Sequence, residues 1–122
     1  MKSTTPFHLI LLILLVSCGS QSSRPEKINT PENILSHDKM VDVLVDFHLA
    51  ESTVKYYTEY GAKPQQIAAR IYPEILEKHQ ISRKEFRNSM DFFTEEPERM
   101  QVIYSDVMEQ LSSRESEIRT GK

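Results

Sequence analysis

Apolar side chains recur at helical spacing in four stretches of the chain, and no stretch shows the sustained apolar-polar alternation of a half-buried strand. The longest stretch runs from about His37 to Tyr60, with apolar residues three or four positions apart at Met40, Val43, Phe47, Ala50, Val54 and Tyr57. This spacing predicts one amphipathic helix. Ser36 is suited to cap its first turn, and Gly61 is suited to the left-handed position after its end because it has no Cβ atom.

Three further segments carry their own helix start signals. The second helix is expected to begin at Pro64 and contains Pro73, which predicts a kink or a short break. The third begins with a capping box, in which the Ser82 hydroxyl accepts from the Glu85 amide while the Glu85 carboxylate reaches back. The fourth begins near Pro97. Short connections favour neighbouring helices packed as hairpins, so the predicted fold class is all-α, a small bundle of about four helices.

The first residues of the chain carry the pattern of an export signal. Lys2 is followed by the run Phe7–Val16, which is apolar except for one histidine. As a helix this run would span about 15 Å, half of the hydrocarbon core of a bilayer. It therefore predicts a signal peptide over residues 1–17 and not a transmembrane helix.

The four residues Leu15–Cys18 match a lipobox, the recognition sequence of the lipoprotein signal peptidase. The motif predicts cleavage between Ser17 and Cys18 and a covalent lipid on the Cys18 thiol; no other cofactor is predicted. Three acyl chains, at ~0.8 kcal/mol per buried CH₂, would anchor the protein in a membrane irreversibly. The absence of acidic residues at positions 19–25 favours the outer membrane, on its periplasmic side. Cys18 is the only cysteine, so an intramolecular disulfide is excluded.

Composition divides the mature chain into three parts. We expect the lipidated cysteine and a flexible tether at residues 18–35, a helical domain at residues 36–111 and a polar tail that frays at residues 112–122. The helical part is long enough for one modest core. The formal net charge of −3 provides no electrostatic footprint for nucleic acid, so no nucleic-acid partner is expected.

One constellation in the first helix suggests chemistry: Asp46, His48 and Glu51. His48 and Glu51 are three residues apart and can share a helix face, where a carboxylate beside an imidazole can bind a metal or transfer protons. A zinc site needs three or four convergent ligands, and these two residues alone do not supply them. Structural pairing is therefore the favoured interpretation, no metal site or catalytic residue is assigned, and the three residues remain a candidate ligand cluster.

Two pairs of adjacent aromatic residues form a candidate partner surface: Tyr56-Tyr57 and Phe92-Phe93. Successive helical residues are about 100° apart, so both members of such a pair rarely bury completely. Aromatic residues are enriched at protein interfaces. One member of each pair is therefore expected to be available to a partner.

The segment Met40–Glu51 (MVDVLVDFHLAE), together with Ile81-Ser82, Pro97-Glu98 and Ile103-Tyr104 further on, resembles a family of small lipoproteins of unknown function from Bacteroidetes-type bacteria. The D-x-H-L-A-E string at Asp46–Glu51 is the most specific part, and the similarity extends over about residues 31–111. The resemblance implies a helical, lipid-anchored domain. It implies no reaction, ligand or catalytic residue.

These observations favour a lipid-anchored envelope protein that catalyses no reaction and presents a helix face to an unidentified envelope partner. The chain has three glycines, too few for a Gly-rich phosphate loop, and it lacks the nucleophile-elbow, P-loop and H-E-x-x-H motifs. One alternative is a metal-binding, small-ligand-binding or hydrolytic domain that uses the candidate ligand cluster. Another is a homo-oligomer that pairs through an apolar strip of Val41, Val45 and Leu49.

Overall fold

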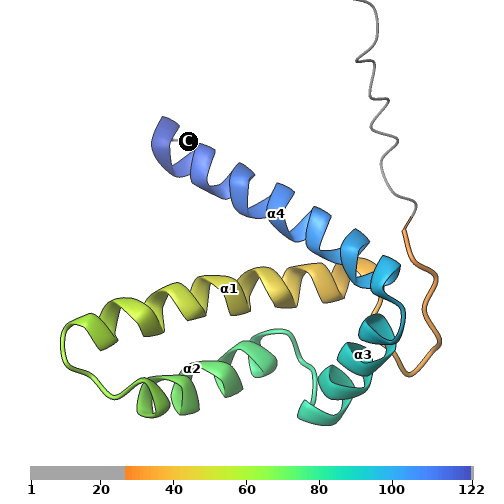
Figure 1. Ribbon diagram of the computed structural model, residues 1–122, viewed down its shortest axis with the longest axis horizontal. Helices are drawn as coiled ribbons and strands as arrows, with labels where there is room; N and C mark the ends of the chain where they lie inside the picture. Colours follow the sequence, from red (N-terminus) through yellow and green to blue (C-terminus); the bar gives the residue numbers. More distant parts are fainter. Residues whose placement is uncertain (1–26, 122) are drawn as a thin grey trace, which may run out of the picture.

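The computed structural model describes residues 27–121, in which four α-helices and no strand are present. They are α1 (His37–Glu59), α2 (Pro64–Lys78), α3 (Arg83–Glu95) and α4 (Pro97–Thr120). α2 folds back along α1 as an antiparallel hairpin, α3 leads to the start of α4, and α4 crosses α1 while running in the same general direction (Figure 1). The predicted all-α fold is confirmed, whereas the predicted signal peptide and Cys18 lie outside the described residues.

Both ends of α1 are closed by the residues that the sequence indicates. At the start, the Ser36 hydroxyl accepts a hydrogen bond at 3.3 Å from the amide of the third helical residue. At the end, Gly61 adopts φ +88°, a left-handed conformation that glycine reaches without a Cβ clash. The Ala62 amide donates to the Tyr57 carbonyl and the Gly61 amide to the Thr58 carbonyl, which together form a Schellman motif.

α2 continues without interruption through Pro73, so the break that the sequence allowed is absent. A proline inside a helix removes one backbone hydrogen bond and crowds the preceding turn. Contacts of the neighbouring Tyr72 offset this loss, because its ring lies 5.3 Å from the Phe47 ring and its hydroxyl donates a hydrogen bond to Glu51. Packing against α1 therefore supports α2 where its own backbone is weakest.

The starts of α3 and α4 agree with the sequence signals. Ser82 Oγ accepts from the Glu85 amide at 3.1 Å and Glu85 Oε2 accepts from the Ser82 amide at 2.7 Å, which completes the capping box. α4 begins at Pro97, where the missing amide hydrogen costs little because first-turn amides lack helical partners. Arg99 closes this corner by donating to the Phe92 carbonyl while its guanidinium lies 4.2 Å from the centroid of the Phe92 ring.

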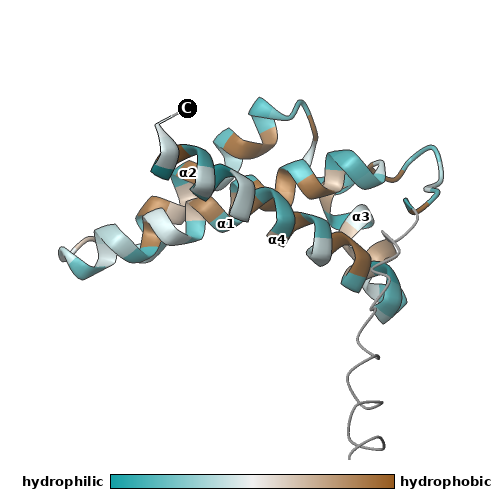
Figure 2. Cartoon of the chain, turned by 90° about the horizontal axis from the view of Figure 1, so that it is seen from above, coloured by the Kyte–Doolittle hydropathy of each residue, from teal (hydrophilic) through white to brown (hydrophobic). Residues whose placement is uncertain are grey.

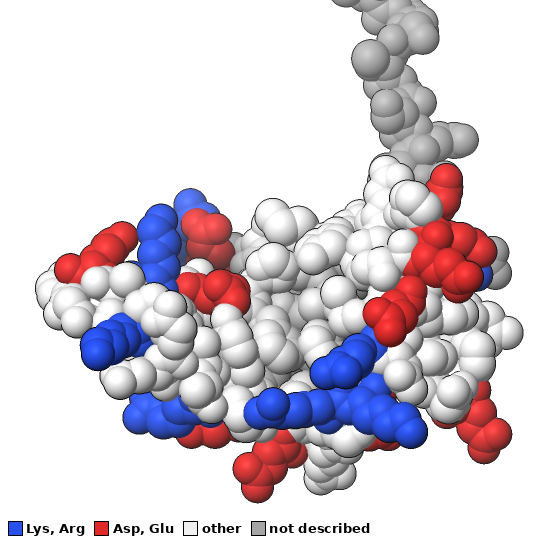
Figure 3. Space-filling view, turned by 60° about the horizontal axis from the view of Figure 1, so that its bottom comes forward, with Lys and Arg blue, Asp and Glu red and all other residues white. Residues whose placement is uncertain are grey.

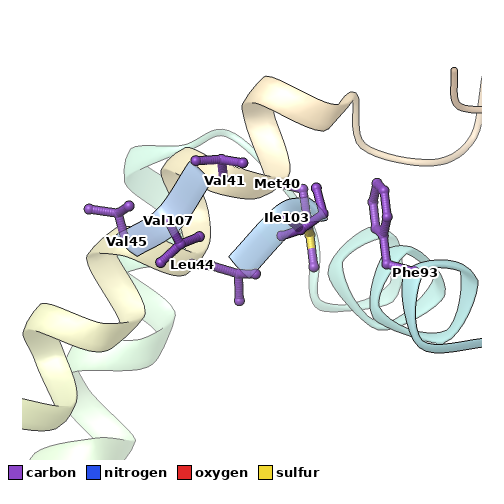
Figure 4. Packing of buried hydrophobic residues seen from close by; sticks show 7 residues of the cluster. All are labelled: Met40, Val41, Leu44, Val45, Phe93, Ile103 and Val107. Atoms are coloured by element: carbon purple, nitrogen blue, oxygen red, sulfur yellow. The ribbon is translucent and has the colours of Figure 1, made fainter. Parts of the chain in front are cut away.

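The main core lies where α4 crosses the first half of α1 and α3 covers one side (Figure 4). Its buried side chains come from three helices: Met40, Val41, Leu44, Val45, Phe93, Ile103 and Val107. Val41 and Val45 belong to this core because α4 packs over them. The strip expected to mediate self-association is therefore not an exposed surface, and only Leu49 of its three residues is exposed.

The segment before α1, which comprises residues 27–35 of the expected tether, packs on the domain. Ile28, Ile34 and Leu35 pack against the core, and the Leu35 amide donates to Ser89 Oγ at 2.9 Å. Most residues of this segment are polar, but it contains three apolar residues that cover one end of the core. Residues 18–26 of the expected tether lie outside the described residues.

The expected polar tail is the last part of α4, which continues to Thr120. Arg114 reaches Asp46 in α1, and Arg119 pairs with Glu115 one helical turn earlier at 3.2 Å. The low apolar content of residues 112–120 predicted fraying, but one long-range ion pair and good helix-forming residues extend the helix. The domain therefore includes residues on both sides of the range 36–111 inferred from the sequence.

Each helix carries both apolar and polar residues along its length (Figure 2). The largest buried cluster of apolar residues joins α1, α3 and α4, as expected for helices that share a core. Of the helices formed by residues 27–121, none combines the length and the apolar character needed to cross a membrane.

Candidate functional site

Asp46, His48 and Glu51 all lie on α1, but the structure does not bring them to one point. Asp46 lies at the junction with the end of α2 and with α4, whereas His48 and Glu51 line a groove beside α3. Within the described part of the chain, no three His, Cys, Asp or Glu side chains are arranged to hold a metal ion. The candidate ligand cluster thus divides into two separate environments.

Asp46 is a nearly buried carboxylate that contacts three basic side chains. Its Oδ2 lies 2.7 Å from both Lys78 Nζ and His79 Nε2, and its Oδ1 accepts from Arg114 Nη1 at 3.4 Å. Burial alone would raise the pKa of Asp46, but the hydrogen bonds from Lys78 and His79 outweigh burial and hold this pKa below its ordinary value of 3.8. Asp46 therefore joins α1 to α2 and α4 through a structural network of ion pairs.

The contact between Asp46 and Arg114 is the last of three polar contacts along the crossing of α1 and α4. We call these contacts the polar seam; they are His37–Asp106 at 2.7 Å, Asp42–Gln110 at 3.2 Å and Asp46–Arg114 at 3.4 Å. Partners advance by four or five residues on α1 and by four on α4, so the two helices run side by side in the same direction. The seam sets the register between α1 and α4.

His37 is the most buried polar residue of the seam, with 3% of its surface exposed. The Ile28 amide donates a hydrogen bond to His37 Nδ1 at 3.4 Å. Because a backbone amide can only donate, Nδ1 acts as the acceptor, so the ring proton is on Nε2 and is donated to Asp106. His37 thereby connects the N-terminal segment, α1 and α4. Sequence reasoning missed this role because Ile28 and Asp106 are distant in the chain; the only signal is the four-residue spacing of Asp106, Gln110 and Arg114 beside an apolar stripe.

On another face of α1, residues of three helices surround a hollow of about 180 Å³, which we call the aromatic groove. Its lining residues are Leu44, Phe47, His48, Glu51, Phe86, Met90 and Tyr104. The Phe47 and Phe86 rings stack with centroids 5.0 Å apart, and the His48 ring meets the Tyr104 ring edge-on at 5.9 Å. The groove is therefore apolar inside, with an imidazole and a carboxylate at its rim.

The rim carboxylate, Glu51, already has a partner in α2. It accepts a hydrogen bond from the Tyr72 hydroxyl, and this bond raises the pKa of Tyr72, since ionised tyrosine would place a second negative charge beside Glu51. His48 and Glu51 thus share one groove but make separate contacts, with α4 and α2 respectively.

The candidate partner surface also divides. Phe93 is completely buried in the core and cannot contact a partner, while Phe92 is half-buried beneath Arg99. Tyr56 and Tyr57 are both exposed at the end of α1, where their rings meet edge-on. Both tyrosines are therefore exposed, whereas in the phenylalanine pair only Phe92 is partly exposed.

The fold and the site define a small all-α domain whose polar groups mostly serve its own helix packing. The chain belongs to the DUF4296 family, a domain of unknown function, which matches residues 31–117. The match begins at Pro31 and ends within α4, so it includes residues 31–36 before α1 and α4 as far as Glu117. No curated protein and no solved structure is detectably similar to the chain.

Proposed function

We propose that the protein is a lipid-anchored domain of the bacterial cell envelope that binds a partner protein through the aromatic groove and catalyses no reaction. The anchor is supported by the lipobox at residues 15–18, whose Cys18 would carry the covalent lipid. The resemblance of Asp46–Glu51 to small lipoproteins of Bacteroidetes-type bacteria supports the same lipid anchoring, and the lack of acidic residues at positions 19–25 favours the outer membrane on its periplasmic side.

The aromatic groove is the observation that carries the binding part of the proposal. Its volume of about 180 Å³ is smaller than the roughly 300–1,000 Å³ of typical small-molecule sites, and it suits one apolar side chain of a partner. Phe86, Met90 and Tyr104 belong to residue types that are enriched at protein interfaces. The His48 and Glu51 rim would orient that partner side chain by polar contacts, as in other interfaces with an apolar centre and a polar edge.

A metal or hydrolytic site built from Asp46, His48 and Glu51 is less well supported. Asp46 is occupied by Lys78, His79 and Arg114, which leaves two ligands where a zinc site requires three or four. The discriminating measurement is metal analysis of protein purified without a His tag, before and after His48→Ala. Bound metal that is lost on this substitution would support the metal site and contradict our proposal.

Photo-crosslinking in intact cells tests the groove. A crosslinking amino acid replaces Tyr104, which is exposed at the mouth of the groove, and in a matched control it replaces Gln65, which is exposed on α2. We expect one dominant protein adduct from position 104, none of the same mass from position 65, and loss of the adduct when Met90→Arg places a charge in the groove.

Circular dichroism of the Met90→Arg chain controls for folding. An adduct that persists in the folded Met90→Arg chain, or that forms equally from position 65, would contradict binding in the groove. The anchor is tested separately by mass spectrometry of the native polypeptide. A mature chain that begins at Cys18 and carries lipid is the expected result, and an unmodified thiol would remove the proposed anchor.

A further inference from the structure

Three tyrosines at the end of α1 form an exposed aromatic cluster. The Tyr56 ring lies 5.5 Å from that of Tyr57 and 4.8 Å from that of Tyr60, centroid to centroid. Their exposed fractions are 55%, 48% and 75%, and every residue from Lys55 to Gly61 is exposed. We call this group the tyrosine cluster. α2 packs beside α1 but leaves these rings uncovered, so the domain's own packing does not account for them.

The residue types in and beside the tyrosine cluster match the interface of a phospholipid bilayer. Tyrosine combines an apolar ring with a hydroxyl that prefers water, and it is enriched where membrane and water meet. Lys55 precedes the cluster and Lys63 follows it, and a lysine can lay its carbon chain against apolar groups while its ammonium reaches lipid phosphates. Glu59 is the single acidic residue between these lysines. The cluster thus pairs interfacial rings with a small excess of positive charge.

The position of the tyrosine cluster favours contact with a membrane surface over insertion into a pocket of another protein. It lies at the tip of the α1–α2 hairpin, at the end of the molecule opposite the N-terminal segment (Figure 1). On the face shown in Figure 3, acidic side chains gather towards the N-terminal end, whereas the hairpin end carries both signs of charge. A projecting tip has no surrounding ring of contacts to exclude water, which protein hot spots require. It can enter a headgroup layer without such a ring.

The anchor proposed above limits how far the cluster can be from a bilayer. Lys27 lies nine positions after Cys18, and this length of chain spans at most about 30 Å. α1 has 23 residues and is about 35 Å long, so a domain lying along the membrane brings the hairpin tip to the headgroups. Because the anchor makes this contact intramolecular, a patch of three rings is sufficient.

We infer that the tyrosine cluster is a second membrane contact, which rests on phospholipid headgroups and orients the anchored domain with α1 along the bilayer. This inference depends on the lipid anchor of the proposed function. It leaves the aromatic groove free for the protein partner, because the two sites lie on different parts of the domain. The tyrosine cluster thus contacts a lipid surface. The alternative that the experiment must distinguish is a protein that covers the cluster.

Tryptophan fluorescence can test the contact because the chain contains no tryptophan. Tyr60→Trp places the only tryptophan in the cluster, and Met108→Trp, at a site 58% exposed on α4, provides the matched control. The lipid-bearing chains are reconstituted into phosphatidylethanolamine–phosphatidylglycerol vesicles with and without brominated acyl chains. We expect the Tyr60→Trp chain to lose at least twice the fraction of emission that the Met108→Trp chain loses, with a shift to shorter wavelength only in the former.

Flotation of the same vesicles separates this inference from the anchor. If the chains float but both are quenched equally, or the Tyr60→Trp chain is not quenched, the membrane contact is wrong and the anchor stands. If the emission of the Tyr60→Trp chain shifts only after envelope proteins are added, a protein covers the cluster and the inference is overturned. If the chains do not float, the anchor fails and the inference fails with it. Circular dichroism confirms that both variants are folded.

Discussion

The two halves of α1 differ sharply in their surroundings. From Met40 to Asp46 every residue except Asp42 is buried, whereas from Leu49 to Tyr60 only Ala50 and Val54 are buried. The first half is covered by α4 and by the core residues of α3, while α2 runs beside the second half (Figure 1). The start of α1 thus lies at the centre of the fold, whereas its end projects from the core and is mostly exposed.

The direction of α4 causes this difference. The polar seam holds α4 against α1 as far as Asp46–Arg114. The C-terminal end of α4 diverges from α1 (Figure 1). Ile118, in the diverging part, is 83% exposed. Local stability should follow the same division, because regions with few buried apolar contacts open at low free-energy cost. The comparison teaches that one helix carries dense packing at its start and exposed aromatic side chains at its end.

Matched aromatic-to-alanine substitutions in the two regions should show the largest contrast. Phe93→Ala empties a fully buried site and is expected to lower the free energy of unfolding by about 3–5 kcal/mol. Tyr60→Ala, at the exposed hairpin tip, should change it by less than about 0.5 kcal/mol. Urea unfolding followed by circular dichroism measures both values, and equal losses would break the comparison.

Asp46→Asn removes the carboxylate charge at the end of the densely packed half of α1. At pH 7 we expect a loss of about 1–3 kcal/mol, because three basic side chains lose their common acceptor charge. Asp42→Asn, whose carboxylate accepts from Gln110, is the milder control.

The effect of Asp46→Asn should also depend on pH in a defined direction. The pKa of Asp46 is lowered on folding, so its contribution is complete above the ordinary value of 3.8 and is lost as pH falls through the folded-state value. The difference in unfolding free energy between the two chains should therefore shrink as pH falls below about pH 4, where Asp46 itself takes up a proton. A difference that stays unchanged as pH falls from about 4 to about 2 would contradict the ion-pair assignment.

Gly61→Ala tests the turn that ends the exposed half of α1. An added Cβ meets no neighbouring atom, but φ +88° is strained for alanine and should cost about 1–2 kcal/mol. Gly121→Ala, at φ +68° after the diverging end of α4, should cost less in global unfolding because that end can fray locally. Thermal unfolding of both variants ranks them, and the reverse order would mean that the end of α4 is the better-held region.

Tyr72→Phe removes the hydrogen bond between α2 and Glu51 and should cost only about 0.5 kcal/mol, because the pair is solvent-accessible. The sharper readout is alkaline titration of tyrosinate absorbance. Folding raises the pKa of Tyr72, so its contribution is complete below the ordinary value of 10.0 and is lost as pH rises through the folded-state value. The native chain should show a late-ionising phase from Tyr72, and Tyr72→Phe should abolish that phase.

Much of the fold could be predicted from residues that are close in the sequence. The Ser82–Glu85 capping box, Pro97 at the start of α4 and Gly61 after α1 act within one or two turns, and each is found where it was expected. The candidate site was harder to predict. Glu51 and His48 share a groove as the three-residue spacing suggested, but Asp46 is separated from them by its ion pairs.

The sequence by itself determined four helices, their starts and the end of α1, because capping and helical periodicity depend on side chains a few positions apart. Only the tertiary structure decided which residues of α1 are covered and which polar groups meet. The partners of His37 and Asp46 in α4 are 69 and 68 positions away, and that of Leu35 in α3 is 54 positions away. Contacts at such separations depend on how the helices cross, and the order of residues along the chain does not encode that crossing in any local pattern.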